Sequence, residues 1–567
     1  MKETRLPAGS GAGRSTPRRL VRMALPLLAV PLLVGLAQPG EPPQAAPPPD
    51  PPEMIIHLLQ RATFGPRPEE IAQAMESGME GWLDAQMDIS REVDPRLDRR
   101  LARHPGALMS PAEARGTFAP PRDVAELALL RERFQSGETL TPEERERLRT
   151  AAASGPGRLV LDLQAARLHR AVHSSRQLEE VMVGFWMDHF NVFVGKGQVR
   201  YHVADYEATA IRPHVFGDFE EMLQSVASHP AMLLYLDNAR NVAPDTIRLR
   251  GLRGRGGPGT DRPLPGINEN YARELLELHT LGVDGGYTEA DVREVARVFT
   301  GWGVVPPSRE GRGAGRVALR SRGEPGSFVF RPELHDGGRK TVLGRDLQGR
   351  GEGEGRELLS LLSRHPSTAR TVATALATRF VADHPPASLV ERLEAVFLET
   401  DGDLAEVTKT LFLSPEFHDP AHRGNRVRSP FLLATAALRL TGAELQDPRG
   451  ILEHLRTMGE LPYGAEPPTG FPQEAGGWGS SGAMVARIDF LSSLAAGEVR
   501  GVQLPPSSPL LEMGDNPLEE LRALLLPWST LGPGEDSFAS GTEGGASPSD
   551  LRQALTLVLA SPAFQTH

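Results

Sequence analysis

Two predicted helices joined by a short glycine turn, in residues 267–302, constrain the fold of this chain more than any other stretch. They have the sequence INENYARELLELHTLGVDGGYTEADVREVARVFTGW. Asn268 can accept hydrogen bonds from the free amides of a first helical turn, so the first helix is expected to begin there. Gly282 can adopt the left-handed conformation that ends a helix. Because the connection is tight, the two helices are expected to pack against each other.

The first helix is predicted to have an apolar face that contains one histidine. At about 100° per residue, His279 falls within an arc formed by Tyr271, Ala272, Leu275, Leu276 and Leu278. The opposite face carries Asn270, Arg273, Glu274 and Glu277. Glu274 and His279 point roughly 140° from each other, so they cannot hold one metal ion from this helix alone.

Two interpretations of the charged face remain open. In one, Arg273 pairs with Glu269 and Glu277 and stabilises the helix. In the other, Glu274 and Glu277 lie one turn apart and share a ligand. The second helix is predicted to begin at Thr288, with Asp291 completing a capping box, and to bury Val292, Val295, Ala296 and Phe299.

A second informative stretch is residues 178–193, which contains the sequence FWMDHFNVF. As a helix it places His189 among the aromatic side chains of Phe185, Trp186 and Phe193. A buried imidazole must find hydrogen-bond partners, and the simplest one is a backbone carbonyl group. If His189 and His279 instead meet within about 8 Å, they can share a ligand in one pocket.

These residues support two hypotheses about function. In the first, the chain is an envelope assembly or binding protein whose polar side chains hold its helices together. In the second, it is a metal-dependent or acid–base enzyme with His189, His279, Glu274 and Glu277 as candidate catalytic residues. The cofactor is not defined, although a divalent metal is possible. Candidate binding residues are Asn268, Asn270, Arg273, Trp302, His202 and Glu207.

Composition excludes several classes of protein. The 567 residues carry a net charge of −11, which argues against nucleic acid as the main partner. The chain has no cysteine, so disulfides, thiolate metal sites and a cysteine nucleophile are excluded. The sequence contains no nucleophile elbow, no zinc-protease motif and no phosphate-binding loop of the known types.

The first 37 residues have the features of an export signal. Arg14, Arg18, Arg19 and Arg22 precede an apolar run at 23–37, which is too short for a membrane span and ends in small residues suited to cleavage. We therefore expect export to the periplasm or the extracellular space, with no stable membrane span after cleavage. A proline-rich linker is expected at 38–53.

The remaining residues, 54–567, are predicted to form one large, mainly α-helical body with long Gly/Pro-rich insertions. Its expected sub-regions are 54–302 and 327–500, followed by an insertion at 501–549 and a final helix at 550–561. One short β-hairpin is expected, in which 328–330 pairs with 340–343. The sequences LFLSPEF (411–417) and LVLASPAF (557–564) predict that the same helix-capping arrangement occurs twice.

Several long motifs resemble a bacterial family known as domain of unknown function 1800. They include FWMDHFNVF, RPHVFGDFEEML (212–223), HPAMLLYLDNARN (229–241), the 268–302 segment and HDGGRKTVLG (335–344). The resemblance covers most of the chain after residue 54. It implies an exported, mainly helical protein without an established activity, and its partner is expected to be another exported envelope protein encoded nearby.

Overall fold

The computed structural model describes residues 50–567 except for 89, 91–93, 121–122, 245–265, 307–322 and 505–554. The expected export signal, most of the expected linker, most of the expected insertion at 501–549 and the first part of the expected final helix therefore lie outside the described residues. Helix α1 begins at Pro52, inside the expected linker. The Asp50 carboxylate accepts a hydrogen bond of 2.8 Å from the backbone N–H of Met79.

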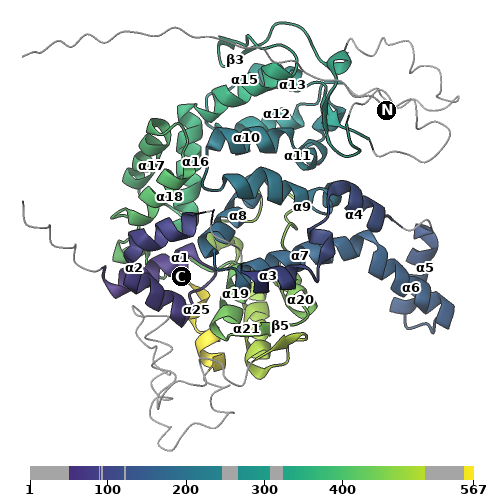
Figure 1. Ribbon diagram of the computed structural model, residues 1–567, viewed down its shortest axis with the longest axis vertical. Helices are drawn as coiled ribbons and strands as arrows, with labels where there is room; N and C mark the ends of the chain where they lie inside the picture. The colour runs from purple at the N-terminus through teal and green to yellow at the C-terminus, as the bar shows by residue number, and fades with distance from the viewer. Residues whose placement is uncertain are drawn as a thin grey trace, which may run out of the picture. The chain divides into compact units, whose positions relative to one another are not determined.

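The described part of the chain is mainly α-helical, as the sequence predicts (Figure 1). The helices before residue 190 are α1 (Pro52–Ala62), α2 (Pro68–Met87), α3 (Pro95–Leu101), α4 (Pro111–Thr117), α5 (Val124–Gln135), α6 (Pro142–Ser154), α7 (Pro156–His173) and α8 (Gln177–His189). Those up to residue 300 are α9 (Val203–Tyr206), α10 (Phe219–Ser228), α11 (Pro230–Tyr235), α12 (Asn270–Glu274) and α13 (Glu289–Val298). The remaining ones are α15 (Glu352–Ser363), α16 (Pro366–Phe380), α17 (Ala387–Glu399), α18 (Leu404–Leu413), α19 (Pro430–Leu440), α20 (Arg449–Met458), α21 (Ser481–Ala496) and α25 (Pro562–Gln565).

Prolines start many of these helices. A proline in the first helical turn loses no hydrogen bond, because the N–H that it lacks would have no partner there, and its fixed φ suits the helix. Two of these prolines follow a histidine that caps the helix. The Nδ1 atoms of His229 and His365 each accept a backbone N–H two residues later, at 3.1 Å. The abundance of proline therefore marks helix starts as well as loops.

The strands form three two-stranded antiparallel pairs within the described residues. Strand β1 (Trp302–Val304) pairs with β2 (Phe328–Phe330), β3 (Thr341–Val342) with β4 (Arg345–Asp346), and β5 (Glu444–Leu445) with β6 (Val502–Gln503). The predicted hairpin between 328–330 and 340–343 is therefore wrong in its pairing. Each segment is extended as expected, but each finds a different partner.

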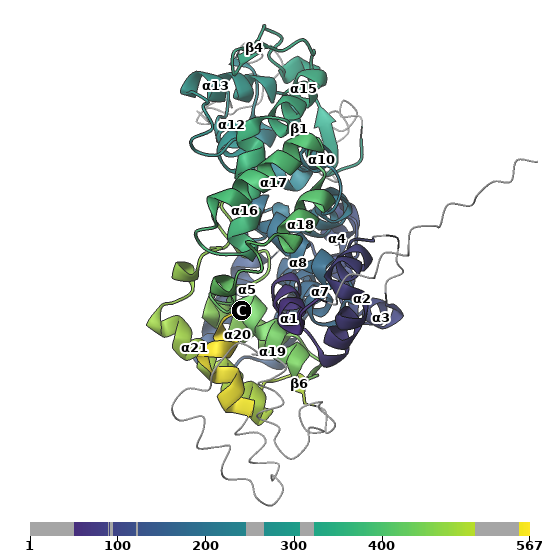
Figure 2. The same cartoon turned by 90° about the vertical axis from the view of Figure 1, so that its left-hand side faces the viewer.

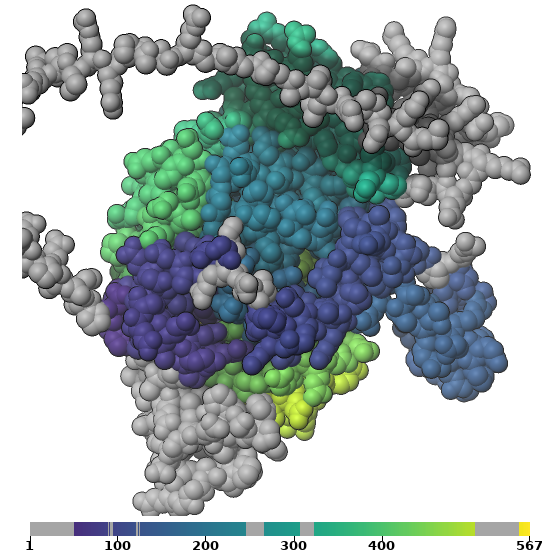
Figure 3. All heavy atoms as spheres, in the orientation of Figure 1, coloured from purple at the N-terminus to yellow at the C-terminus, as the bar shows by residue number. Residues whose placement is uncertain are grey.

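One large hydrophobic core joins helices from α1 to α25. Helices α8 and α19 are among its most deeply buried elements, and in Figures 1 and 2 both lie in the interior. Helices α5 and α6 form a separate hairpin with a small core of its own, built on Leu127, Leu130 and Leu140. This hairpin stands out from the rest of the surface in the space-filling view (Figure 3). No described helix is both long and apolar enough to cross a membrane.

Candidate functional site

The first helix of the 267–302 segment is shorter than expected and changes its winding. It is α-helical only over Asn270–Glu274, and Leu275–His279 form a π-helical turn. The Thr280 hydroxyl donates to the Leu275 carbonyl at 2.6 Å, and Gly282 has the expected positive φ of 84°. Such turns insert one extra residue into a helix and often occur near functional sites. His279 is only 2% exposed, as predicted from its position in the apolar arc.

His189 and His279 are neighbours, but they meet through a backbone group. The Nε2 atom of His189 lies 3.3 Å from the carbonyl oxygen of His279. Burial lowers the pKa of His189 to about 4 and that of His279 to about 3, so both imidazoles are neutral at pH 7. The described residues contain no group of three or more His, Asp or Glu side chains arranged to hold a metal ion.

The glutamates proposed to complete this pair lie apart from it. Glu277 accepts a hydrogen bond from the Tyr287 hydroxyl at 3.5 Å, and Glu274 is partly buried. Burial and the charge of Glu277 raise the pKa of Glu274. Among the described residues, neither glutamate forms a hydrogen bond or ion pair with either histidine.

The candidate binding residues Asn268, Asn270 and Arg273 organise the helix start. The Asn268 side chain accepts from the backbone N–H of Asn270 at 3.0 Å, as expected for a cap, although the α-helix begins only at Asn270. Asn268 and Asn270 donate to the carbonyl groups of Asp237 and Leu236. Arg273 forms two hydrogen bonds to Glu289, at 2.8 and 2.9 Å, and lies 3.8 Å from Glu269. Arg273 thus pairs with Glu289, at the start of α13, and not with Glu277 as expected.

The other three candidate binding residues, Trp302, His202 and Glu207, are also buried and contact other core residues. Trp302 is 1% exposed and packs edge-on against Phe299 and Phe328. His202 is fully buried, with Nε2 3.3 Å from the Arg115 guanidinium, and burial lowers its pKa to about 3. Glu207 accepts hydrogen bonds of 2.6 Å from both Arg212 and the Tyr463 hydroxyl.

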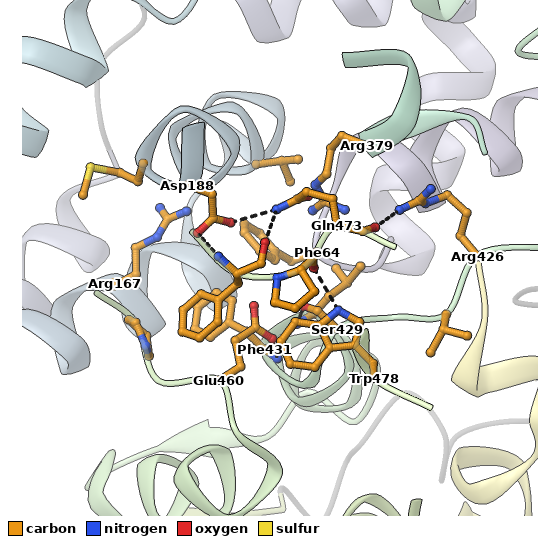
Figure 4. A pocket seen from close by; sticks show the side chains of 18 of the residues that line it. Phe64, Arg167, Asp188, Arg379, Arg426, Ser429, Phe431, Glu460, Gln473 and Trp478 are labelled. Atoms are coloured by element: carbon orange, nitrogen blue, oxygen red, sulfur yellow. Dashed lines mark hydrogen bonds between the residues drawn. The ribbon is translucent and has the colours of Figure 1, made fainter. Parts of the chain in front are cut away.

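A cavity of about 90 Å³ lies between helices α8 and α19 and the segment that follows α20 (Figure 4). We call it the acid–arginine pocket. Its charged lining residues are Asp188, Glu460, Arg167, Arg379 and Arg426, and its aromatic ones are Phe64, Phe431, Phe471, Trp478 and Tyr463. The lining thus combines aromatic surface with converging charged groups, and converging polar groups orient the ligand in sites for small molecules.

Asp188 reaches the pocket from the last turn of α8, beside His189. Its carboxylate accepts hydrogen bonds from the Gln473 side chain at 3.1 Å and from the backbone N–H of Phe471 at 3.5 Å. Burial raises the pKa of Asp188 to about 6, although these hydrogen bonds and the charge of Arg379 oppose the rise. This carboxyl group therefore changes its charge close to neutral pH.

Glu460 reaches the same pocket from the segment that follows α20. Its carboxylate accepts the backbone N–H of Phe431 at 2.7 Å, near the start of α19. Burial raises the pKa of Glu460 to about 7, and the charge of Asp188 adds to this rise. Two carboxyl groups from distant parts of the sequence thus titrate near neutrality at one cavity, a property that clusters at functional sites.

Two arginines line the pocket opposite these acids. Arg426 is 3% exposed, forms an ion pair of 2.8 Å with Asp383 and donates to the Gln473 carbonyl group. Arg379, at the end of α16, forms no hydrogen bond or ion pair with any described residue. Its guanidinium group is therefore available to a ligand.

A buried ion-pair network supports one wall of the pocket. Arg167 and Arg212 both bind the Glu180 carboxylate, at 2.8 Å. Arg212 also binds Glu207, which accepts from the Tyr463 hydroxyl in the pocket lining. Glu207 therefore lies next to the site, where it holds Tyr463.

Sequence analysis did not identify this pocket. It assigned no role to Asp188, Glu460, Arg379 or Arg426. The motif FWMDHF contained a partial signal, because its only acid lies on the helix flank that turns toward α19. Nothing in the local sequence of Glu460 indicates that it meets Asp188.

The fold and the pocket define a mainly helical protein with a buried acid–arginine cavity. Comparison of the sequence with models of known protein families identifies the family. The family model described as "Protein of unknown function (DUF1800)" matches residues 57–566, and the chain belongs to this family. No curated protein and no solved structure matches the chain.

Proposed function

We propose that this chain is an exported protein that binds a small organic ligand in the acid–arginine pocket and exchanges protons with it. One observation carries the proposal: Asp188, Glu460 and Arg379, whose guanidinium group pairs with no described residue, line the same cavity. Structural ion pairs would place each carboxylate directly against a cation, whereas these two acids accept hydrogen bonds from backbone, amide and hydroxyl groups.

The two carboxyl groups suit general acid–base chemistry. An acid or base works best when its pKa lies near the working pH, and values of about 6 and about 7 meet this condition for Asp188 and Glu460. Because the charge on Asp188 disfavours ionisation of Glu460, the pair favours a state with one proton. In that state Asp188 can accept a proton from a ligand while Glu460 donates one.

The walls favour a ligand with an apolar or ring-shaped part. Phe64, Phe431, Phe471 and Trp478 present aromatic surface to the cavity. The indole N–H of Trp478 is already bonded to the carbonyl of Pro472, at 3.0 Å, so it presents its ring without an open donor. Such surfaces stack on flat or ring-shaped ligands.

The proposal places the function at this pocket and leaves the His189–His279 pair a structural role. It includes export to the periplasm or extracellular space, which rests on the sequence of residues 14–37. The alternative of an envelope assembly protein with a partner encoded nearby stays a prediction. Metal-dependent chemistry would need a ligand set other than His189 and His279 with Glu274 or Glu277, which the described structure does not bring together.

A ligand screen tests the proposal. Small acids, sugars, amino acids and phosphorylated compounds would be added to the purified chain at pH 6.5, and the melting temperature recorded. Each hit would then be incubated with the protein and its products identified by mass spectrometry. We expect Asp188→Asn and Glu460→Gln to weaken binding of the hit at least tenfold or to abolish its conversion.

Matched controls separate the pocket from general charge effects. Asp284→Asn changes an exposed acid, and Glu453→Gln changes an exposed acid on α20, near Glu460 in the sequence. Both controls should keep wild-type binding, as should His279→Ala if it folds. A ligand that binds the two acid variants as tightly as wild type, but is lost in His279→Ala, would show that the site lies at the histidines.

A further inference from the structure

Four buried or partly buried arginines gather next to the acid–arginine pocket. Arg61, Arg426 and Arg428 are at most 4% exposed, and Arg379 is partly buried. The charges of Arg426, Arg379 and Arg428 all act on Arg61, so the four guanidinium groups form one cluster. Within the described residues, the ion pair between Arg426 and Asp383 is the single salt bridge that any of them makes.

Local structure brings these arginines together. Residues 426–428 are extended and pair antiparallel with the segment 565–567, through a bridge between Val427 and Thr566. Alternate residues of an extended segment point to the same side, so Arg426 and Arg428 share one face. Arg61, on α1, donates to the side chain of Asn425 at 2.8 Å and so lies beside the same segment.

Several of the buried N–H groups have no acceptor. These are Nε and Nη1 of Arg61 and Nε of Arg426, which bond to no described residue. A charged donor that is buried without an acceptor has lost its hydrogen bonds to water, and this lowers the stability of the fold. Burial lowers the pKa of Arg426 only to about 10, so the group stays charged at neutral pH. The cluster therefore presents positive charge and open donors with no matching acceptors.

We propose that the ligand of the acid–arginine pocket carries an anionic group, a carboxylate or a tetrahedral oxyanion such as phosphate, which Arg379 and Arg426 bind. Guanidinium groups recognise both kinds of anion through paired N–H donors. Arg379 and Arg426 are the two members of the cluster that line the cavity, and Arg379 has its donors free of ion pairs and hydrogen bonds with described residues. This inference rests on the proposed function and names the ligand class for the same site.

The acids of the pocket make this binding dependent on pH. Asp188 faces Arg167 and Arg379, whereas Glu460 faces Arg379, Arg487 and Asp188. Around Arg426 the charged groups are Arg379, Asp383 and Glu474, and burial keeps the neighbouring His567 neutral by holding its pKa far below the usual value. Protonated Asp188 and Glu460 leave the cavity positive. Once ionised, they repel an anion, so anion affinity should fall as pH rises through the range from 6 to 7.

The test is calorimetric titration of the full chain with sulfate and, separately, with acetate, in a cationic buffer at pH 5.5 and at pH 8. Sulfate keeps its charge over this range, and the two probes distinguish tetrahedral from carboxylate ligands. We expect saturable binding of at least one probe at pH 5.5 that weakens tenfold or more at pH 8. In the double variant Asp188→Asn, Glu460→Gln neither group titrates, so the affinities for the anion at pH 5.5 and at pH 8 should be equal.

Substitutions on α16 test whether the guanidinium group of Arg379 binds the anion. Arg379→Gln should weaken anion binding at pH 5.5 at least tenfold, and Arg379→Lys should restore part of it. Because Arg379 makes no ion pair with a described residue, its replacement should leave the fold intact, which circular dichroism checks. Arg370 is exposed, lies on the same helix and pairs with Glu394, so Arg370→Gln is the matched control and should bind the anion like wild type.

Two outcomes would overturn the inference. One is the absence of saturable binding of either anion up to millimolar concentration, and the other is equal binding by Arg379→Gln and wild type. Either result leaves the proposed function standing if the ligand screen yields a neutral compound that requires Asp188 and Glu460. If the screen also yields no compound sensitive to those two acids, the proposed function fails as well.

Discussion

The Nε2 atom of His189 lies 3.3 Å from the main-chain carbonyl oxygen of His279, across the contact between α8 and the π-helical turn. A carbonyl oxygen only accepts, so Nε2 of His189 must carry the proton and donate. The ring is packed against Phe190, with a centroid distance of 4.6 Å. This pair therefore fastens two helices, as expected for a core histidine bonded to a carbonyl group.

Replacing His189 by alanine should destabilise the fold without removing a metal ion. The variant loses one partly buried hydrogen bond and the ring packing, so we expect its free energy of unfolding to fall by about 2 to 4 kcal/mol. Urea denaturation at pH 7.5 measures this change. His384→Ala, at an exposed position, is the control and should stay near wild type. Stoichiometric metal in the wild type that is lost in a folded His189→Ala variant would contradict this account.

The acids of the pocket should lower stability at high pH. Asp188 has a usual pKa of 3.8 and one of about 6 in the folded chain. Well below pH 3.8 the group is protonated in both the folded and unfolded states. As pH rises from 4 to 6, the unfolded state releases its proton first, so stability falls by about 1.4 kcal/mol per unit at most. Asp188→Asn should therefore gain about 1 to 3 kcal/mol over wild type at pH 8 and little at pH 4.

The same argument holds for Glu460, with its pKa raised from 4.5 to about 7. Glu460→Gln should gain stability over the range from pH 5 to pH 7. Denaturant unfolding at four pH values between 4 and 8 measures both effects, with Asp284→Asn and Glu453→Gln as controls. Gains that are equal at pH 4 and pH 8 would show that these carboxyl groups titrate normally. Variants that gain stability and lose ligand binding would show that these two acids are kept for function although they destabilise the fold.

Features set by neighbouring residues could be predicted from the sequence. The Thr288 and Asp291 capping box forms as expected, and the stripe from Val292 to Phe299 is buried. Each depends on helix geometry and on the side chains of one turn. The π-helical turn at 275–279 was not predicted, because a repeat of 100° per residue assumes an unbroken helix.

Features set by distant contacts could not be predicted. The pairing of β1 with β2 joins segments separated by residues 307–322, and no local signal distinguishes this partner from the segment after β2. The pocket depends in the same way on Asp188 from α8 meeting Glu460 from a segment after α20. Pairing and burial of this kind are decided by tertiary packing, which one sequence does not reveal.

Loss of Glu207 should destabilise the core rather than remove a reactive group. Burial opposes its ionisation, but Arg212, Arg167 and Arg170 hold its pKa at about 2. Its ion pairs therefore stabilise the fold fully above the usual pKa of 4.5, and this contribution is lost as pH falls toward 2. Glu207→Gln should lower the free energy of unfolding by about 3 kcal/mol at pH 7, because Arg212 keeps a buried charge with one partner fewer.

A double-mutant cycle with Tyr463→Phe tests the link from this network to the pocket. The Tyr463 hydroxyl donates to Glu207 at 2.6 Å, so the two changes should couple by about 1 kcal/mol or more. Urea unfolding of the four proteins at pH 7 gives this coupling energy. Additive effects would mean that the contact contributes nothing to stability.

The two Ser-Pro-x-Phe sequences make the same capping contacts and should respond alike to mutation. The hydroxyl of Ser414 donates to the Leu411 carbonyl at 2.8 Å and accepts the N–H of Phe417 at 3.2 Å. Ser561 donates to Val558 at 2.7 Å and accepts from Phe564 at 3.2 Å. Ser414→Ala and Ser561→Ala should each lower the free energy of unfolding by about 1 kcal/mol, which denaturant titration measures. Ser77→Ala, whose hydroxyl makes only contacts of 3.3 and 3.5 Å, is the control and should have little effect. A loss at Ser414 without one at Ser561 would show that the second copy does not support the fold in solution.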